Sequence, residues 1–248
     1  MTAAANVDLR AEAAGALAIS CQGLELDYGR GTLIGPLNLD IPTGACVALV
    51  GENGAGKSSL ISMILGLRPS TRGIASLFGE NVSRQSSRRG IGYLQESVDF
   101  PERARAHDLI VLHSRLTGLD RRKAAEGLEA YLDGFGLELT TKPIRAYSKG
   151  MKQRLALAIA MLDCGRMLIL DEPNSGLDPV GIAMLRGKLD ALKSAGTTLL
   201  ISTHRLTEVM QLADQVLVLH KGKVAGESLM SDFHDFNAFE KYFLERVK

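Results

Sequence analysis

The chain has 248 residues, which corresponds to one large domain or to one core domain with an appendage. Its 29 lysines and arginines nearly balance its 28 aspartates and glutamates, so no global basic field exists to hold nucleic acid, and we expect no direct nucleic-acid partner. Hydrophobic residues make up 46% of the sequence, an ordinary globular share that argues against intrinsic disorder.

No part of the sequence predicts a membrane-spanning helix, and the cysteines do not predict a metal-binding site. The longest uncharged apolar stretches, such as Ile41–Gly51, are shorter than the ~20 residues that a spanning helix needs. Residues 1–16 are rich in alanine but interrupted by charges, so we expect a loose leader and not a secretory signal. Cys21, Cys46 and Cys164 are widely separated in apolar surroundings, which predicts buried, reduced thiols.

The first elements in the chain are extended. Short segments broken by glycines over Leu17–Leu39 predict an antiparallel β patch. After it, apolar runs rich in Val, Ile and Leu alternate with amphipathic stretches, which is typical of an α/β domain with a mostly parallel sheet. The strands are expected at Cys46–Val50, Ile91–Gln95, Met167–Asp171, Thr197–Ser202 and Val216–Leu219.

The other expected elements are helices. Residues 97–162 contain helical patterns without an intervening strand, which predicts a helical lobe set against the core of a 17–234 domain. Residues 235–248, with phenylalanines spaced three and four apart, predict a terminal amphipathic helix. The expected helices are Lys57–Leu67, Arg103–Thr117, Arg121–Phe135, Lys149–Leu162, Pro179–Ala195 and Leu206–Ala213.

A glycine-rich loop follows the strand that ends at Val50. It fits the pattern G-x-x-x-x-G-K-[ST] at every fixed position and opens a helix, so its backbone N–H groups are expected to converge on phosphate. Lys57 is expected to reach the β- and γ-phosphates, and the Ser58 hydroxyl to bind Mg²⁺. The predicted phosphate-binding residues are Gly51, Asn53, Gly54, Ala55, Gly56, Lys57, Ser58 and Ser59.

Two acidic residues end the apolar strand that begins at Met167. Asp171 is placed to organise Mg²⁺ beside the phosphates, and Glu172, one residue further along, is placed to polarise an attacking water as general base. The alternative is a solvated turn without a ligand. His204 directly follows another predicted strand, at the sheet edge where open α/β folds bind ligands.

With the segment Ser148–Gln153 just upstream of Met167, this set of motifs resembles the nucleotide-binding subunit of ATP-binding cassette (ABC) transporters. The resemblance extends from Tyr28 to about Gly222. It implies the ABC ATPase fold, a P-loop NTPase core with a mostly parallel sheet, an N-terminal antiparallel β patch and an inserted helical lobe, with ATP and Mg²⁺ as ligands.

The resemblance also implies roles for residues outside the phosphate loop. Tyr28 would stack on adenine, although without the family it is equally a core or surface aromatic. Gln95 would join Mg²⁺ and the attacking water to a membrane-facing surface, and His204 would contact the γ-phosphate. Ser175, Gly176, Leu177 and Asp178 would form a loop that crosses between two subunits.

The signature segment Tyr147-Ser148-Lys149-Gly150-Met151 departs from the commonest family form, Leu-Ser-Gly-Gly-Gln. Ser148 and Gly150 match it, whereas Lys149 replaces a glycine and adds positive charge. Ser148 can cap the helix that it opens and create a second anion site. The variant resembles that of small two-subunit exporters and of the transporter for nitrous oxide reductase maturation, which implies export.

Lys57 and Ser148 are 91 residues apart, with the helical lobe between them, so one ATP is not expected to reach both. The resemblance implies a head-to-tail homodimer around two ATP molecules, docked on integral membrane permease subunits through residues near Gln95 and in Ser97–His113, at the cytoplasmic face of the membrane. The alternative is a soluble ABC ATPase that remodels a macromolecular complex. A phosphoryl-transfer kinase would leave Ser148 and His204 unexplained.

Overall fold

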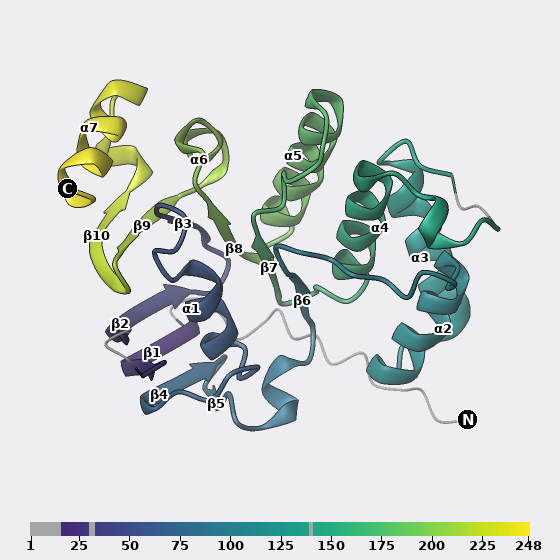
Figure 1. The fold of residues 1–248 in the computed structure, drawn as a ribbon, viewed down its shortest axis with the longest axis horizontal. Helices are drawn as coiled ribbons and strands as arrows, with labels where there is room; N and C mark the ends of the chain where they lie inside the picture. Colours follow the sequence, from purple (N-terminus) through teal and green to yellow (C-terminus); the bar gives the residue numbers. More distant parts are fainter. Residues whose placement is uncertain (1–15, 30–32, 139–140) are drawn as a thin grey trace.

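The computed structural model describes residues 16–29, 33–138 and 141–248. Apart from Ala16, the expected leader lies outside these residues. The described chain forms two sheets, a group of helices at one end and a C-terminal helix at the other (Figure 1).

The larger sheet has six strands in the order β10-β9-β3-β8-β7-β6, all neighbours parallel except β9 and β10. Its central strands β3, β7 and β8 are buried along their whole length, because both faces are covered. The sequences of β3 and β7 are almost uniformly apolar, and β8 is apolar at Leu199–Ile201. The mostly parallel sheet is therefore confirmed. Its strands are β3 (Cys46–Val50), β6 (Ile91–Leu94), β7 (Met167–Asp171), β8 (Thr198–Thr203), β9 (Gln215–His220) and β10 (Lys223–Leu229).

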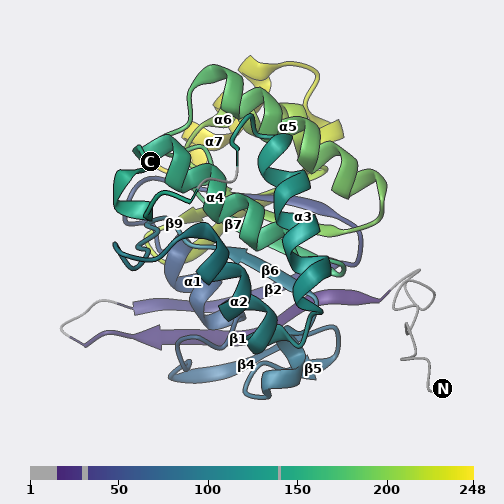
Figure 2. The same cartoon turned by 90° about the vertical axis from the view of Figure 1, so that its right-hand side faces the viewer.

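The smaller sheet is antiparallel, in the order β2-β1-β4-β5, and confirms the expected β patch. It lies below the larger sheet in Figure 2, and buried side chains of both sheets and of helix α1 (Lys57–Ile64) form one core. Two of its strands were not predicted from the sequence. Its members are β1 (Leu17–Asp27), β2 (Leu33–Pro42), β4 (Arg72–Leu77) and β5 (Glu80–Asn81).

The helical lobe lies to the right in Figure 1 and has a second core, in which Leu128, Phe135 and Leu157 are fully buried. Two of its helices begin at side-chain caps that the sequence supplies: Asp120 accepts from the N–H groups of Arg122 and Lys123, and Ser148 accepts from that of Met151. The lobe contains α2 (Ala106–Thr117), α3 (Arg121–Asp133), η2 (Ile144–Ala146) and α4 (Lys149–Met161).

Of the remaining helices, those that follow β7 cover the larger sheet and its far edge, whereas the short one between β5 and β6 packs beside the smaller sheet. In α7 the buried Phe239 belongs to a third core with residues of β9 and α6, as the phenylalanine spacing predicts. Within the described ranges, no helix has both the length and the hydrophobicity that crossing a bilayer requires. These elements are η1 (Gln85–Arg88), α5 (Pro179–Ser194), α6 (Leu206–Leu212), η3 (Met230–Asp232) and α7 (Phe236–Arg246).

Candidate nucleotide-binding and catalytic site

The phosphate loop connects β3 to α1 and presents backbone N–H groups. Gly54 has φ of 82° and Gly56 of 104°, conformations that residues with a Cβ rarely adopt. Gly56 occupies the N-cap position of α1 and provides no side-chain cap, so the first N–H groups of this helix are left for a ligand. A helix start of this kind favours an anion such as phosphate.

Lys57 lies inside this loop. Its side chain is almost fully buried, and Nζ donates to the carbonyl oxygens of Gly51 at 2.8 Å and Glu52 at 3.2 Å. The same ammonium lies 3.5 Å from Oε1 of Glu172. The phosphate loop and the acidic end of β7 therefore meet at Lys57, as the two motifs predict.

Asp171 and Glu172 leave the end of β7 in different environments. Asp171 is 1% exposed and accepts a short hydrogen bond from the Ser202 hydroxyl, its partner in the β7–β8 register. Glu172 has φ of 48°, in the left-handed region, where a residue other than glycine marks strain that is common at functional sites. The strained turn directs Glu172 toward Lys57 while Asp171 stays buried.

His204 comes from the loop after β8 and faces Glu172. Its Nδ1 lies 3.0 Å from both carboxylate oxygens of Glu172. About half of the imidazole side chain is exposed, whereas that of Glu172 is 13% exposed. The structure therefore brings Lys57, Glu172 and His204 into one cluster.

Two hollows adjoin this cluster and share Asn53, Glu96 and Glu172 in their walls. The first, of about 340 Å³, is lined by residues of the phosphate loop. The second, of about 250 Å³, holds His204. The first is also lined by Tyr28, Ile34, Gly54, Gly56, Lys57, Ser58 and Ser59; the second is also lined by Asn174, Ser175, Gly176, Leu177, His204, Arg205 and Glu208.

Tyr28 forms part of the first hollow and is 44% exposed. Its hydroxyl and the Ser59 Oγ are 2.7 Å apart, and the Arg68 guanidinium carbon lies 5.0 Å from its ring centroid. An exposed, anchored aromatic ring beside the phosphate loop fits a stacking role toward a base.

Gln95 is not among the described residues that line either hollow. Its Nε2 donates to the Ser97 carbonyl at 2.6 Å, and its neighbour Glu96 lines both hollows. Sequence reasoning missed Glu96, Ser202 and Ile34, because none of them carries a motif. The β6–β7 and β7–β8 pairings bring the first two to the site.

The signature segment lies beside the second hollow. Ser148 caps α4 by accepting from the Met151 N–H at 3.2 Å. The Lys149 side-chain carbons pack on Gly176, and a Cβ on Gly150 would lie 3.1 Å from the Gly176 carbonyl oxygen. Among the described residues that line the first hollow, none belongs to Ser148–Gly150.

The expected dimer loop ends at Asp178, which caps α5. Its carboxylate accepts from the Gly181 N–H at 2.9 Å and pairs with Arg154 at 2.7 Å. The Gly181 hydrogen bond, followed by the one from Arg154, holds the pKa of Asp178 below its usual range. Since Arg154 belongs to α4, this ion pair connects the signature helix to the loop.

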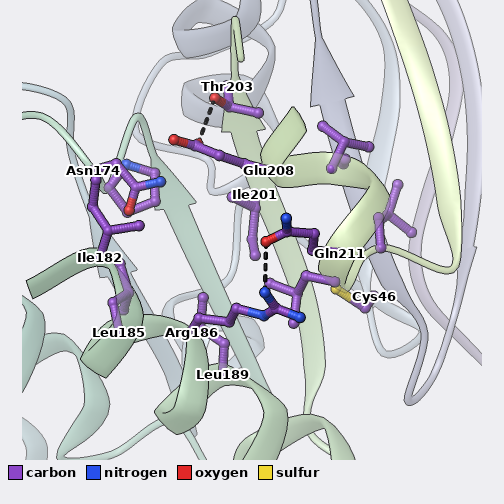
Figure 3. Close-up of a pocket in the computed structure, with 16 residues that line it drawn as sticks. Cys46, Asn174, Ile182, Leu185, Arg186, Leu189, Ile201, Thr203, Glu208 and Gln211 are labelled. Carbon is purple, nitrogen blue, oxygen red and sulfur yellow. Dashed lines mark hydrogen bonds between the residues drawn. The ribbon is translucent and has the colours of Figure 1, made fainter. Parts of the chain in front are cut away.

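A further cavity, of about 70 Å³, lies between α5, α6 and the sheet, and Asn174 and Glu208 separate it from the His204 hollow. Figure 3 shows Arg186 and Gln211 facing each other there, joined by a 2.6 Å hydrogen bond. The remaining lining is mostly aliphatic. This cavity is too small and too apolar for a triphosphate.

Known proteins are similar to this chain in sequence and in fold. Residues 34–175 match the family described as ABC transporter. The chain is 35% identical over 230 residues to the lantibiotic transport ATP-binding protein SrtF of Streptococcus pyogenes, covering 90% of this chain and 99% of that protein. It is 36% identical over 225 residues to the bacitracin transport ATP-binding protein BcrA of Enterococcus faecalis, covering 88% and 71%.

A solved structure described as the ATP binding subunit of an ABC transporter superposes with a TM-score of 0.80 at 28% identity, covering 93% of this chain and 95% of that one. The superposition and the sequence match point to the same family. The chain therefore belongs to the ABC transporter family as an ATP-binding subunit, an ATPase that powers transport.

Proposed function

We propose that the chain hydrolyses ATP as a head-to-tail dimer and that this cycle drives export through separate membrane subunits. The observation that carries the proposal is the separation of the two anion sites. Within the described residues, the phosphate loop and the helix start at Ser148 do not line the same hollow. Both are helix N-termini: α1 has no side-chain cap, and α4 is capped by Ser148. A second copy supplies the missing half.

In each copy, the triphosphate lies on the N–H groups between Gly54 and Ser59, with Lys57 at the β- and γ-phosphates and the adenine on Tyr28. The buried ammonium of Lys57 currently rests on two carbonyl oxygens and near Glu172. Phosphate oxygens are stronger partners for it, because they carry full negative charge.

The donor set suits magnesium. An exposed Ser58 hydroxyl lines the hollow, and the buried Asp171 directly precedes Glu172, which lines the same hollow. Mg²⁺ prefers such oxygen ligands together with substrate phosphates. Ser58 and Asp171 would hold the ion, with Gln95 as the third expected ligand. When bound, it neutralises charge on the phosphates.

Glu172 acts as the general base. It accepts a proton from the attacking water, while His204 fixes the orientation of its carboxylate and approaches the γ-phosphate. ATP closes the dimer because it bridges one copy's phosphate loop and the other copy's Ser148, Lys149 and Gly150. Loss of the γ-phosphate then favours opening.

The partner copy is also expected to meet the Ser175–Asp178 loop. This loop lines the hollow of its own Glu172 and His204 and packs against its own signature helix at Lys149 and Gly150. A partner that contacts the loop would therefore influence both sites of one copy.

A docking surface for the permease subunits is supported by a hollow of about 670 Å³ between η1, β6, α2 and α4, with Arg89, His113 and Leu116 among the residues of its walls. Leu112 and Leu116 of α2 are 52% and 75% exposed. Phe100 and Leu109, two of the residues expected at this surface, are partly buried against the core of the helical lobe. We therefore extend the proposed surface beyond His113 to Leu116.

Docking there would hold the chain at the cytoplasmic face of the membrane. The proteins SrtF and BcrA are named for transport of a lantibiotic and of bacitracin, which supports export over the remodelling alternative. The cargo would be chosen by the permease subunits.

The proposal is tested by trapping the dimer. Glu172→Gln should bind ATP, lose turnover and run as a dimer in size-exclusion chromatography with ATP and Mg²⁺. The matched control is Lys57→Ala in the Glu172→Gln background, which should stay monomeric because the phosphate grip is lost. A Glu172→Gln protein that binds ATP yet remains monomeric would contradict the dimer, and unchanged hydrolysis would remove Glu172 as base.

A further inference from the structure

Tyr28 is an exposed aromatic residue that is held from two directions. Its hydroxyl and the Ser59 Oγ are 2.7 Å apart, and the guanidinium of Arg68 lies over its ring at 5.0 Å from the centroid. That distance is within the ~6 Å at which a cation and a ring attract.

Both of these groups are fixed to helix α1. Ser59 lies in its first turn, and the Arg68 N–H donates to the Ser62 carbonyl at 3.1 Å just after its end. Pro69 follows and restricts the Arg68 backbone to extended conformations. Because α1 begins at Lys57, the plane of the Tyr28 ring is set relative to the phosphate loop.

A second set of contacts holds the Arg68 segment beside β1. The Thr71 N–H donates to the Glu25 carbonyl at 2.7 Å, and the Asp27 N–H donates to the Thr71 hydroxyl at 3.0 Å. The guanidinium is therefore carried to the ring by a backbone that is anchored at both ends.

The two faces of the ring differ. Tyr28 lines the hollow of the phosphate loop together with Gly56 and Ser59, whereas Arg68 is not among the described residues of that wall. Because Arg68 is absent from that wall, we infer that the guanidinium covers the face of the ring turned away from the hollow and leaves the other face open to it. A base that enters the hollow can stack on the open face while the cation stays on the opposite one.

Resting on the proposed function, we propose that Arg68 is a positioning residue for the base of the nucleotide. It acts through Tyr28: the guanidinium holds the ring as a rigid platform, and base, ring and guanidinium stack in that order. Arg68 then contributes to the affinity for nucleotides that carry a base and contributes nothing to the grip on the triphosphate.

Calorimetric titration with ADP, which is not hydrolysed, tests this assignment. Arg68→Ala should raise the Kd for ADP about two- to fivefold, the size expected of an exposed cation and ring. It should raise the KM for ATP in step, with kcat unchanged, and leave inhibition by inorganic tripolyphosphate unaltered. Arg68→Lys should keep part of the effect because it keeps the cation.

The matched control is Arg72→Ala. Arg72 is a nearby exposed arginine whose Nε lies 4.0 Å from Oε2 of Glu25, and it contacts no aromatic ring among the described residues, so its removal should leave the Kd for ADP unchanged. In a Tyr28→Ala background, Arg68→Ala should produce no further loss, because the platform through which it acts is gone.

Three outcomes would overturn the assignment. Tighter ADP binding by Arg68→Ala would place the guanidinium on the face that the base needs. An equal loss for tripolyphosphate would make Arg68 a general attractor of phosphate, and an unchanged Kd for ADP would remove it from the site. Failure of the unmodified protein to bind ADP would instead refute the proposed function.

Discussion

Glu172 and His204 face each other from the ends of two adjacent parallel strands, with Nδ1 of the imidazole 3.0 Å from both carboxylate oxygens. The carboxylate also lies 3.5 Å from Nζ of Lys57. The proposed base is thus held between two cationic or hydrogen-bonding groups before any nucleotide enters, which keeps its orientation defined.

This arrangement predicts that His204→Ala slows hydrolysis about tenfold to a hundredfold, since a hydrogen bond to a charged group contributes about 1.5–3 kcal/mol. ATP binding should be retained. Glu172→Gln should cost more, about 10²- to 10⁴-fold, because it removes the base itself. Single-turnover release of phosphate measures both.

The double variant decides whether His204 acts through Glu172. If it does, adding His204→Ala to Glu172→Gln should give little further loss, and multiplication of the two losses would show independent roles. His107→Ala, at an exposed position on α2, is the control and should hydrolyse ATP at the normal rate.

The parts of the site that could be predicted from the sequence carry local signals. The glycine pattern before Lys57 requires a strand, a turn and a helix in that order, and the apolar run before Asp171 requires a buried strand. Glu96 and Ser202 carry no such signal, since only the pairing of β6, β7 and β8 brings them to the site. The side-chain orientation of Gln95 depends likewise on its contact with Ser97.

The missed strands have physical reasons too. In β10 half-buried residues alternate with exposed ones, and it pairs with β9 alone at the edge of the sheet, so its sequence lacks an apolar run. In β4 the first three residues are exposed, and its pairing with β1 joins segments far apart in the chain. Phe135, expected within a helix, instead follows the end of α3 at Gly134 and is buried in the core.

Two glycine substitutions should change stability in opposite directions. A Cβ on Gly92 in β6 would clash with the Ala160 backbone oxygen, at 1.9 Å. Gly92→Ala should therefore destabilise the fold by about 1–3 kcal/mol or more. Gly187 lies on the exposed side of α5 with no atom within 4 Å of an added Cβ, so Gly187→Ala should stabilise it by about 0.5–1 kcal/mol. Urea unfolding gives both values, and equal effects would contradict the close approach of α4 to β6.

The three cysteines should be unreactive in the folded protein. All are buried, and this burial raises the pKa of Cys21 and Cys46 to about 12 and that of Cys164 to about 11. The thiolate, which is the form that alkylates, is therefore scarce at neutral pH. Mass spectrometry after iodoacetamide treatment should show no modified cysteine in the native state and three in denaturant. Rapid alkylation of a native cysteine would show local opening around it.

The raised thiol pKa values also determine how the stability of the fold changes at alkaline pH. Above the ordinary thiol pKa the unfolded chain releases these protons, whereas the folded chain keeps them until about pH 11–12. The contribution of the thiols to stability is therefore full at neutral pH and declines as the pH rises through that window. Replacing Cys21 by alanine should flatten the alkaline decline in Tm; an unchanged slope would assign the decline to other groups.

The Lys149 ammonium is predicted to contact the ATP bound by the partner copy, while the carbons of its side chain pack within its own chain. Its Cγ, Cδ and Cε lie 3.0–3.2 Å from the position of a Cβ on Gly176, so Lys149→Met keeps this packing and removes only the ammonium. ATP binding to the monomer should persist, while the ATP-bound dimer in the Glu172→Gln background should dissociate more readily and lose salt dependence. Lys152→Met, three positions further along α4, is the control. Equal weakening of monomer binding would place the ammonium at its own nucleotide instead.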